Sequence, residues 1–200
     1  MKGYKKMPSL KGTQTEKNIL TAFAGESQAR NRYTFFASVA KKEGYVQISK
    51  LFEETADQEK EHAKRLFKLL EGGMSSINVD ASFPAGVIGD TAENLVAAAN
   101  GEKEEYTEMY PTFAKIAREE GFEEIAKIMG AIGVAEKHHE ERFLSMVKEL
   151  KEDTIFKKSE RIIWECLNCG YLHIGNSAPE VCPACNHPQA YFARKRDSWR

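Results

Sequence analysis

The feature that most restricts the fold of this chain is an internal repeat. Glu59-x-x-His62 and Glu136-x-x-His139 lie 77 residues apart. Residues three apart on a helix share a face, so each pair presents a carboxylate and an imidazole together. The same shift superposes further matching residues: Phe36 on Phe113, Ala40 on Ala117, Glu43 on Glu120, Gly44 on Gly121 and Arg65 on Arg142. A duplicated helical hairpin predicts a four-helix bundle with both pairs inside it.

The segments between the repeated features set the order of the helices. Thr13 and Glu16 match a capping box and Gly44 matches a helix stop, so the first helix is expected between them. The later helices are expected at about 46–71, 91–119 and 122–151. Residues 72–90 contain glycine and proline without a helical period. This segment is long enough to cross the bundle and start the third helix parallel to the second. The sequence therefore predicts a mainly α fold with a long crossover between helices two and three.

The bulk composition describes a globular protein with a small appended domain. Of the 200 residues 42% are hydrophobic and 30% are charged, and the net charge is −1. This charge gives no attraction toward nucleic acid or an anionic membrane. Residues 1–7 are basic, but no apolar stretch follows that could act as a signal peptide or span a bilayer. We expect a cytoplasmic protein with no nucleic-acid or membrane partner. The predicted parts are a bundle at 1–152, a charged linker at 153–160 and a small domain of strands and loops at 161–200.

All the cysteines lie in this last part, as Cys166-x-x-Cys169 and Cys182-x-x-Cys185. Four cysteines could form two disulfides. Paired C-x-x-C units in an otherwise cysteine-free chain without a secretion signal indicate a metal tetrathiolate instead. Tetrahedral thiolates bind iron or zinc, so the residues alone leave the metal open.

The first helix of each hairpin offers a glutamate at the height of the Glu-x-x-His pairs. Counted from the turn glycines at about 1.5 Å per residue, Glu26 and Glu102 each lie within about one turn of that height. Under the 77-residue shift, however, Glu26 aligns with Lys103. One residue rotates a side chain by about 100° on an α-helix. The sequence therefore predicts a π-bulge between Glu102 and Tyr110 that restores the register.

Carboxylates and imidazoles from four helices would form a site for hard metal ions. Such ligands suit iron or manganese, and carboxylates can bridge two ions. Buried without cations, each carboxylate would cost on the order of several kcal/mol. Glu105, three residues after Glu102, is a candidate seventh ligand. Tyr33 and Tyr110 occupy matching places and are either core aromatics or donors that orient the ligating carboxylates.

Taken together, these residues resemble the rubrerythrin family over essentially the whole chain. The segments that carry the resemblance are 22–33, 54–66, 101–111, 134–140, 166–170 and 182–188. Many ferritin-like proteins share the Glu-x-x-His pattern, but few add a rubredoxin-like tail. The resemblance implies a ferritin-like four-helix bundle followed by a small rubredoxin-like domain. It also implies a di-iron centre in the bundle and a mononuclear iron held by the four cysteines.

The resemblance assigns a role to each residue of the predicted cluster. Glu59 and Glu136 are implied as bridging carboxylates. Glu26 is implied as a terminal ligand of one iron, and Glu102 and His139 as terminal ligands of the other. For the first iron, His62 is implied as the ligand in the reduced state and Glu105 in the oxidised state.

Rubrerythrins are peroxide-scavenging enzymes, so the resemblance implies a peroxidase that reduces hydrogen peroxide to water in oxidative-stress defence. Electrons would come from a nicotinamide-linked reductase or a rubredoxin-type carrier through the tetrathiolate iron. The end of the fourth helix lies about 18–22 Å beyond Glu136 and His139. A head-to-tail homodimer would shorten the electron path, and we expect one on this ground and by resemblance.

Two other functions compete with the peroxidase. A ferroxidase or iron-storage protein could use the same bundle, but iron oxidation needs no electron supply from a tail. A structural bundle with a zinc-ribbon interaction module would hold zinc in the tail and no iron between the helices.

Overall fold

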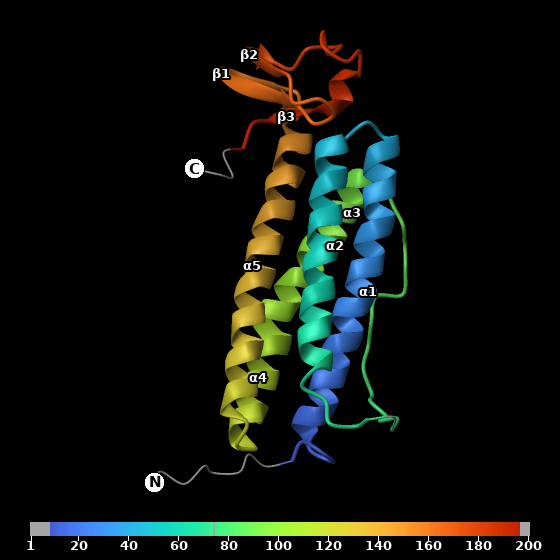
Figure 1. Cartoon of the computed structure of the whole chain (residues 1–200), viewed down its shortest axis with the longest axis vertical. Coiled ribbons are helices and arrows are strands. Elements are labelled where there is room, and N and C mark those ends of the chain that lie inside the picture. Colours follow the sequence, from blue (N-terminus) through green and yellow to red (C-terminus); the bar gives the residue numbers. More distant parts are fainter. Residues whose placement is uncertain (1–8, 74, 197–200) are drawn as a thin grey trace.

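The computed structural model describes residues 9–73 and 75–196, and it forms a long four-helix bundle with a small domain at one end (Figure 1). The basic segment 1–7 lies outside the described residues. The first hairpin consists of α1 (Gln14–Lys42) and α2 (Val46–Phe67). The second consists of α3 (Thr91–Glu104), the π-helix η1 (Glu105–Met109), α4 (Tyr110–Glu119) and α5 (Glu123–Lys151). The predicted mainly α, ferritin-like bundle is confirmed.

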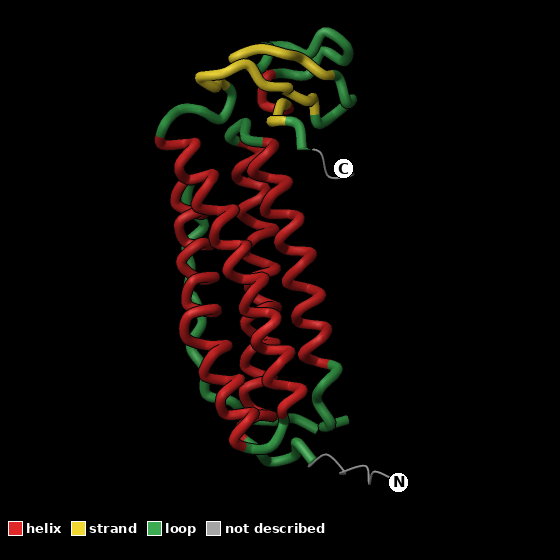
Figure 2. The backbone as a smooth tube through the Cα atoms, turned by 90° about the vertical axis from the view of Figure 1, so that its left-hand side faces the viewer, coloured by secondary structure: helices red, strands yellow, loops and turns green. Residues whose placement is uncertain are grey.

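The crossover runs along the outside of the bundle and returns the chain to the end where α2 begins (Figures 1 and 2). As a result α3 and α4 run parallel to α2, as predicted from the length of this segment. The second helix ends at Phe67, four residues before the predicted end. Each hairpin turns at a glycine with positive φ, +87° at Gly44 and +89° at Gly121, a conformation that side chains rarely adopt.

The two hairpins cap each other. In the turn between α1 and α2, the Glu43 carboxylate accepts hydrogen bonds from the Thr91 backbone N–H (3.0 Å) and hydroxyl (2.5 Å) at the start of α3. In the turn between α4 and α5, Glu120 accepts from the Thr15 backbone N–H (2.8 Å) and hydroxyl (2.6 Å) at the start of α1. A carboxylate at a helix N-terminus satisfies free N–H groups and complements the helix dipole. These two matching glutamate–threonine contacts therefore fix the position of one hairpin relative to the other along the bundle axis.

The small domain contains a three-stranded antiparallel sheet in the order β2-β1-β3. Its strands are β1 (Lys157–Cys166), β2 (Leu172–Ser177) and β3 (Phe192–Arg194), with a 3-10 turn η2 (Gln189–Tyr191) before β3. The prediction of a linker over 153–160 was wrong in its second half, because β1 already begins at Lys157. The early start is explained by the pairing of Lys157 with Ser177, which lies at the end of the β1–β2 hairpin far from Cys166.

Two separate apolar cores fill the bundle. One contains Phe36, Phe52 and Phe143 and lies toward the small domain, and the other contains Ile19 and Met129 and lies toward the opposite end. Residues 23–28 of α1, 57–65 of α2 and 133–142 of α5 contribute no buried side chain to either core, and Ala63, which is buried, belongs to neither. The buried acidic side chains lie in this layer. Among the described helices, none has both the length and the apolar character needed to cross a membrane.

Candidate metal centres

Six ionisable side chains from four helical segments converge between the two apolar cores. They form two groups of four whose ligand atoms lie within 4.8 Å of one another. The groups are Glu26, Glu59, His62 and Glu136, and Glu59, Glu102, Glu136 and His139. Two of the carboxylates, Glu59 and Glu136, belong to both groups. Two adjacent positions that share two carboxylates match the arrangement of a bridged metal pair.

The shared carboxylates present one oxygen to each group. Glu59 places Oε2 3.0 Å from His62 Nδ1 and Oε1 2.9 Å from His139 Nδ1. Glu136 places Oε1 2.9 Å from His62 Nδ1 and Oε2 2.7 Å from His139 Nδ1. At the outer ends, Glu26 lies 3.8 Å from His62 and Glu102 lies 3.5 Å from His139. Each histidine therefore turns the same ring nitrogen toward the cluster.

The chemistry of these donor atoms fits metal ions. Six buried atoms of the cluster have no hydrogen-bond partner among the described residues: Glu26 Oε2, Glu59 Oε1, Glu102 Oε2, Glu136 Oε1, Glu136 Oε2 and His139 Nδ1. Unsatisfied buried oxygens are costly and are rare in native proteins. Hard oxygen ligands with two imidazoles suit iron. The carboxylate and histidine groups are therefore positioned to bind iron.

The pKa values show how strongly the cluster attracts positive charge. Burial raises the pKa of Glu102 to about 8, with His139 opposing and neighbouring carboxylates adding to the rise. Burial also raises the pKa of Glu26 well above 4.5. For Glu59, burial raises the pKa, but the nearby imidazoles of His139 and His62 outweigh it and bring the pKa to about 2. For His139, burial lowers the pKa, but the nearby carboxylates of Glu102, Glu136 and Glu59 bring it to about 12. Protons or metal cations can supply this positive charge.

The predicted π-bulge is confirmed, and it explains how Glu102 reaches the cluster. Residues Glu105–Met109 form a π-helix, and the Tyr110 N–H donates to the Glu105 carbonyl five residues earlier. Before this bulge the repeat has a shift of 76, which places Glu26 on Glu102, and after it the shift is 77, which places Tyr33 on Tyr110. One inserted residue keeps both halves of the third helix in register with the site.

Glu105 lies beside the cluster but belongs to neither group of four. Burial raises its pKa well above 4.5, and the carboxylates of Glu26 and Glu102 raise it further. Its carboxylate is therefore close enough to interact electrostatically with the ligand set. The structure places His62, the other of the two alternating ligands implied by the resemblance, in the first group.

Two buried tyrosines connect the repeats at the site. The Tyr33 hydroxyl of α1 donates to Glu102 Oε1 of α3 at 2.5 Å, and the Tyr110 hydroxyl of α4 donates to Glu26 Oε1 of α1. Burial raises the pKa of both phenols, and the nearby carboxylates raise it further, so both stay protonated and donate. The structure shows both alternatives open from the sequence together: each tyrosine belongs to an apolar core, and each hydroxyl donates to a carboxylate of the cluster.

Sequence reasoning missed the role of Arg142, which appeared there only as the repeat partner of Arg65. Its guanidinium lies largely buried one turn after His139, where Nη1 donates to Gln58 Oε1 (3.1 Å) and Nη2 lies 3.1 Å from Glu54 Oε1. This brace joins α5 to α2 beside the cluster. Arg65 is exposed, so the repeat alone could not show which copy is structural.

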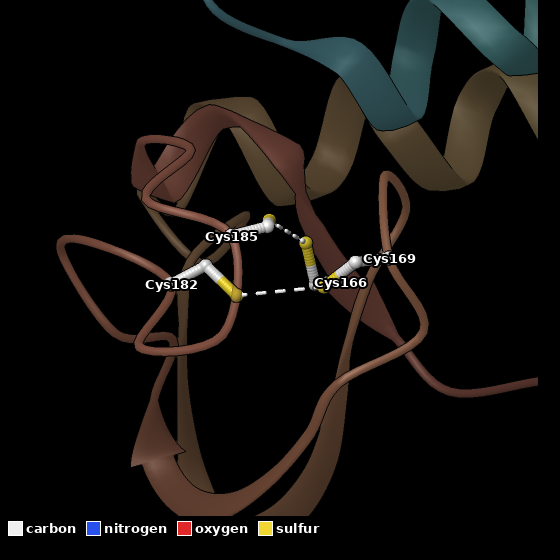
Figure 3. Close-up of side chains that lie close together, drawn as sticks. All are labelled: Cys166, Cys169, Cys182 and Cys185. Atoms are coloured by element: carbon white, nitrogen blue, oxygen red, sulfur yellow. Dashed lines mark hydrogen bonds between the residues drawn. The ribbon is translucent and has the colours of Figure 1, made fainter.

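The four cysteines form a second, separate centre in the small domain (Figure 3). Their sulfurs lie within 4.8 Å of one another, with 3.7 Å from Cys166 to Cys185 and from Cys169 to Cys182. The two Cys-x-x-Cys loops, here called knuckles, have matching backbone donors. The Tyr171 backbone N–H donates to the Cys169 sulfur, and the His187 backbone N–H donates to the Cys185 sulfur. Such N–H donors stabilise thiolate charge in a tetrathiolate metal site.

Comparisons with known proteins agree with this geometry. Residues 17–147 match the family model described as Rubrerythrin, and residues 164–193 match "Rubrerythrin, rubredoxin-like domain". The rubrerythrin of Nitratidesulfovibrio vulgaris is 61% identical over 193 residues, which cover 96% of this chain and 100% of that protein. The rubrerythrin of Porphyromonas gingivalis is 60% identical over 184 residues, which cover 92% of this chain and 91% of that protein. A solved structure of fully reduced, all-ferrous nigerythrin superposes with a TM-score of 0.62 at 30% identity. The superposition covers 98% of this chain and 100% of the nigerythrin chain.

Proposed function

The chain belongs to the rubrerythrin family of di-iron oxidoreductases, and from this premise we propose that it reduces hydrogen peroxide to water in oxidative-stress defence. The observation that carries the proposal is the pair of overlapping ligand groups that share Glu59 and Glu136. The separate cysteine centre supports it, because a peroxidase must be re-reduced after each turnover. Reduction of hydrogen peroxide to two waters consumes two electrons and two protons.

Each residue of the site has a proposed role in holding or positioning the iron pair. Glu26, Glu59, His62, Glu102, Glu136 and His139 would hold two irons, with Glu105 replacing His62 in the oxidised state. When bound, the iron pair supplies two electrons and Lewis acidity to peroxide. Tyr33 and Tyr110 hold the outer carboxylates in place, and the apolar cores on both sides would limit the contact of the cluster with water. A negative Glu105 near the site would favour the more positively charged, oxidised state, because it adds charge where charge has increased.

We also propose that Cys166, Cys169, Cys182 and Cys185 hold one iron that receives electrons from a nicotinamide-linked reductase or a rubredoxin-type carrier. The small domain sits at the α1–α2 turn of its own bundle, where Lys50 Nζ donates to the Leu167 carbonyl at 3.1 Å. Glu59 lies nine residues further along α2, about 14 Å along the helix axis. A head-to-tail homodimer would bring the domain of one protomer nearer to the bundle of its partner.

The experiment that tests the peroxidase is steady-state turnover with hydrogen peroxide, NADH and a reductase. Cys166→Ser should abolish sustained NADH oxidation while pre-reduced protein still consumes about one peroxide per bundle site. Val181→Ser, an exposed neighbour of the second knuckle, is the matched control and should keep full turnover. Sustained peroxide consumption that is unchanged by Cys166→Ser would favour the ferroxidase function instead.

The dimer is tested by mixing two inactive variants. Glu59→Ala lacks a ligand in the bundle, and Cys166→Ser lacks one in the small domain. If electrons pass between protomers, subunit exchange should restore turnover, because one mixed site pairs an intact domain with an intact bundle. Absence of recovery in a dimer shown to have exchanged subunits would place the electron path within one chain.

A further inference from the structure

A cavity of about 290 Å³ lies under the crossover, beside the di-iron site. It is lined by α1, by the end of α3 with η1, by Phe113 of α4 and by residues 80–84 of the crossover. Its lining includes Gly25 and Arg32 of α1, Phe83 of the crossover, and Glu105 and Met109 of η1. The cavity is therefore bounded on one side by a proposed iron ligand and on the other by a surface segment.

The inner end of the cavity adjoins the ligand set. Gly25 directly precedes Glu26, whose carboxylate belongs to the first group of metal ligands. Glu105 lines the cavity and interacts electrostatically with Glu26 and Glu102. At the outer end the cavity is lined by residues 80–84 of the crossover, and Phe83 among them is 42% exposed, so this end lies at the protein surface. A small molecule could pass from the crossover to the Glu26–Glu105 side of the site.

The walls combine polar and apolar groups in a way that suits a small peroxide. Arg32 Nε donates to Gln28 Oε1 at 2.6 Å, and both side chains line the cavity. The remaining N–H groups of the guanidinium can donate to a peroxide oxygen. Phe83 and Met109 supply apolar surface, which tolerates the alkyl group of a small organic hydroperoxide. The cavity is too small and too polar at this edge for a large apolar ligand.

Gly25 is the residue that keeps the cavity open. It lies buried within α1 and has no positive φ, so its backbone does not require glycine. Glycine in a helix interior is destabilising relative to alanine. A Cβ atom at this position would lie 3.9 Å from Phe83 Cε1, in ordinary contact, and a larger side chain would extend into the space between them. The absence of a side chain therefore provides space rather than backbone freedom.

We propose that this cavity is the access route for peroxide and that Gly25 sets the size of hydroperoxide that reaches the di-iron site. The inference rests on the proposed peroxidase function. It predicts that hydrogen peroxide and small alkyl hydroperoxides are accepted and that bulkier ones are excluded by the gap between Gly25 and Phe83. The competing route is the opposite exposure of the site at His62, whose side chain is 19% exposed.

The test compares two variants that narrow the gap between Gly25 and Phe83 with one that widens it. For Gly25→Leu, the rate constant for tert-butyl hydroperoxide with pre-reduced, iron-loaded protein should fall by about tenfold or more, and that for hydrogen peroxide by less. Gly25→Ala should lower both rate constants by less than Gly25→Leu does, and again the rate constant for tert-butyl hydroperoxide should fall more than that for hydrogen peroxide. Phe83→Ala should raise the rate with tert-butyl hydroperoxide. The control is Gly130→Leu, at an exposed helical glycine of α5 with open space around it, which should leave both rates unchanged.

A second readout does not depend on turnover. In crystals pressurised with xenon, density should appear under the crossover in the parent protein and in Gly130→Leu, and it should be absent in Gly25→Leu. Unchanged rates for both peroxides in a Gly25→Leu protein that excludes xenon would overturn the proposed route and point to access at His62. A parent protein that consumes neither peroxide would overturn the proposed function itself, which separates the two failures.

Discussion

Replacing Glu102 by glutamine should change stability in opposite directions with and without metal. Glu102 is 1% exposed, and its Oε1 accepts the Tyr33 hydrogen bond while Oε2 has no partner among the described residues. In the metal-free protein, burial raises its pKa from 4.5 to about 8. The unfolded chain therefore ionises first, and the native state loses stability as the pH rises through this window.

The magnitude follows from the width of the window. Each pH unit between 4.5 and 8 corresponds to about 1.4 kcal/mol, so ionisation of the unfolded chain lowers stability at pH 7 by about 3 kcal/mol. Glutamine does not ionise and still accepts the Tyr33 hydrogen bond, but its buried NH₂ group lacks acceptors, which costs about 1–2 kcal/mol. Metal-free Glu102→Gln should therefore be about 1–2 kcal/mol more stable than the parent at pH 7. As the pH falls the gain should shrink and reverse, so that near pH 4.5 the variant is less stable than the parent by about 1–2 kcal/mol.

With iron bound, the sign reverses. If loss of one anionic ligand weakens binding about a hundredfold, the stabilisation by saturating metal falls by about 2.7 kcal/mol. The assay is anaerobic denaturant unfolding followed by circular dichroism, with excess Fe(II) or with a chelator. Glu108→Gln, at an exposed acid on the same π-helix, is the control and should change neither value. Full metal-dependent stabilisation in Glu102→Gln, or a metal-free form with the same pH dependence as the parent, would show that Glu102 is not a buried metal ligand with a raised pKa.

Two further changes test the register and the caps. Deletion of Thr107 from the π-helix should leave the helix content nearly unchanged but rotate Glu102 by about 100° relative to α4. Metal analysis should then show that the bundle iron is lost while the cysteine iron stays. Two irons still bound in the bundle would contradict this prediction. Glu120→Gln should lower the free energy of unfolding by about 1 kcal/mol at neutral pH, because its carboxylate caps α1 through Thr15. Partial burial raises the pKa of Glu120, but the Thr15 and Gln14 hydrogen bonds hold it below 4.5, so this stability is present above about pH 4.5 and lost as the pH falls through the folded pKa. A difference from the parent that stays constant between pH 7 and pH 3 in denaturant unfolding would contradict the cap.

The architecture was predictable because each part leaves a local pattern. Helical periodicity and the repeat gave four helices, and the length of the crossover gave the parallel direction of the third. The mismatch between Glu26 and Lys103 predicted the π-bulge, since a metal site requires a fixed side-chain direction. The spacing of the cysteines predicted their convergence.

What the sequence could not give depends on long-range contacts. The tyrosine–glutamate bonds join residues 69 and 84 positions apart, so the residues alone left Tyr33 and Tyr110 between two roles. The cap of α1 by Glu120 spans 105 residues, and no local pattern marks it. The start of β1 at Lys157 depends on its pairing with Ser177 rather than on its own composition, which is charged like a linker.

The most direct test of the central claim is anomalous diffraction at the iron absorption edge from crystals of protein purified without added metal. The claim is that the buried carboxylates of the bundle converge in order to hold two cations. We expect two iron peaks about 3.5–4 Å apart between Glu59 and Glu136, and a third among the four cysteine sulfurs. A bundle without metal peaks, or one with these glutamates turned outward into solvent, would contradict it.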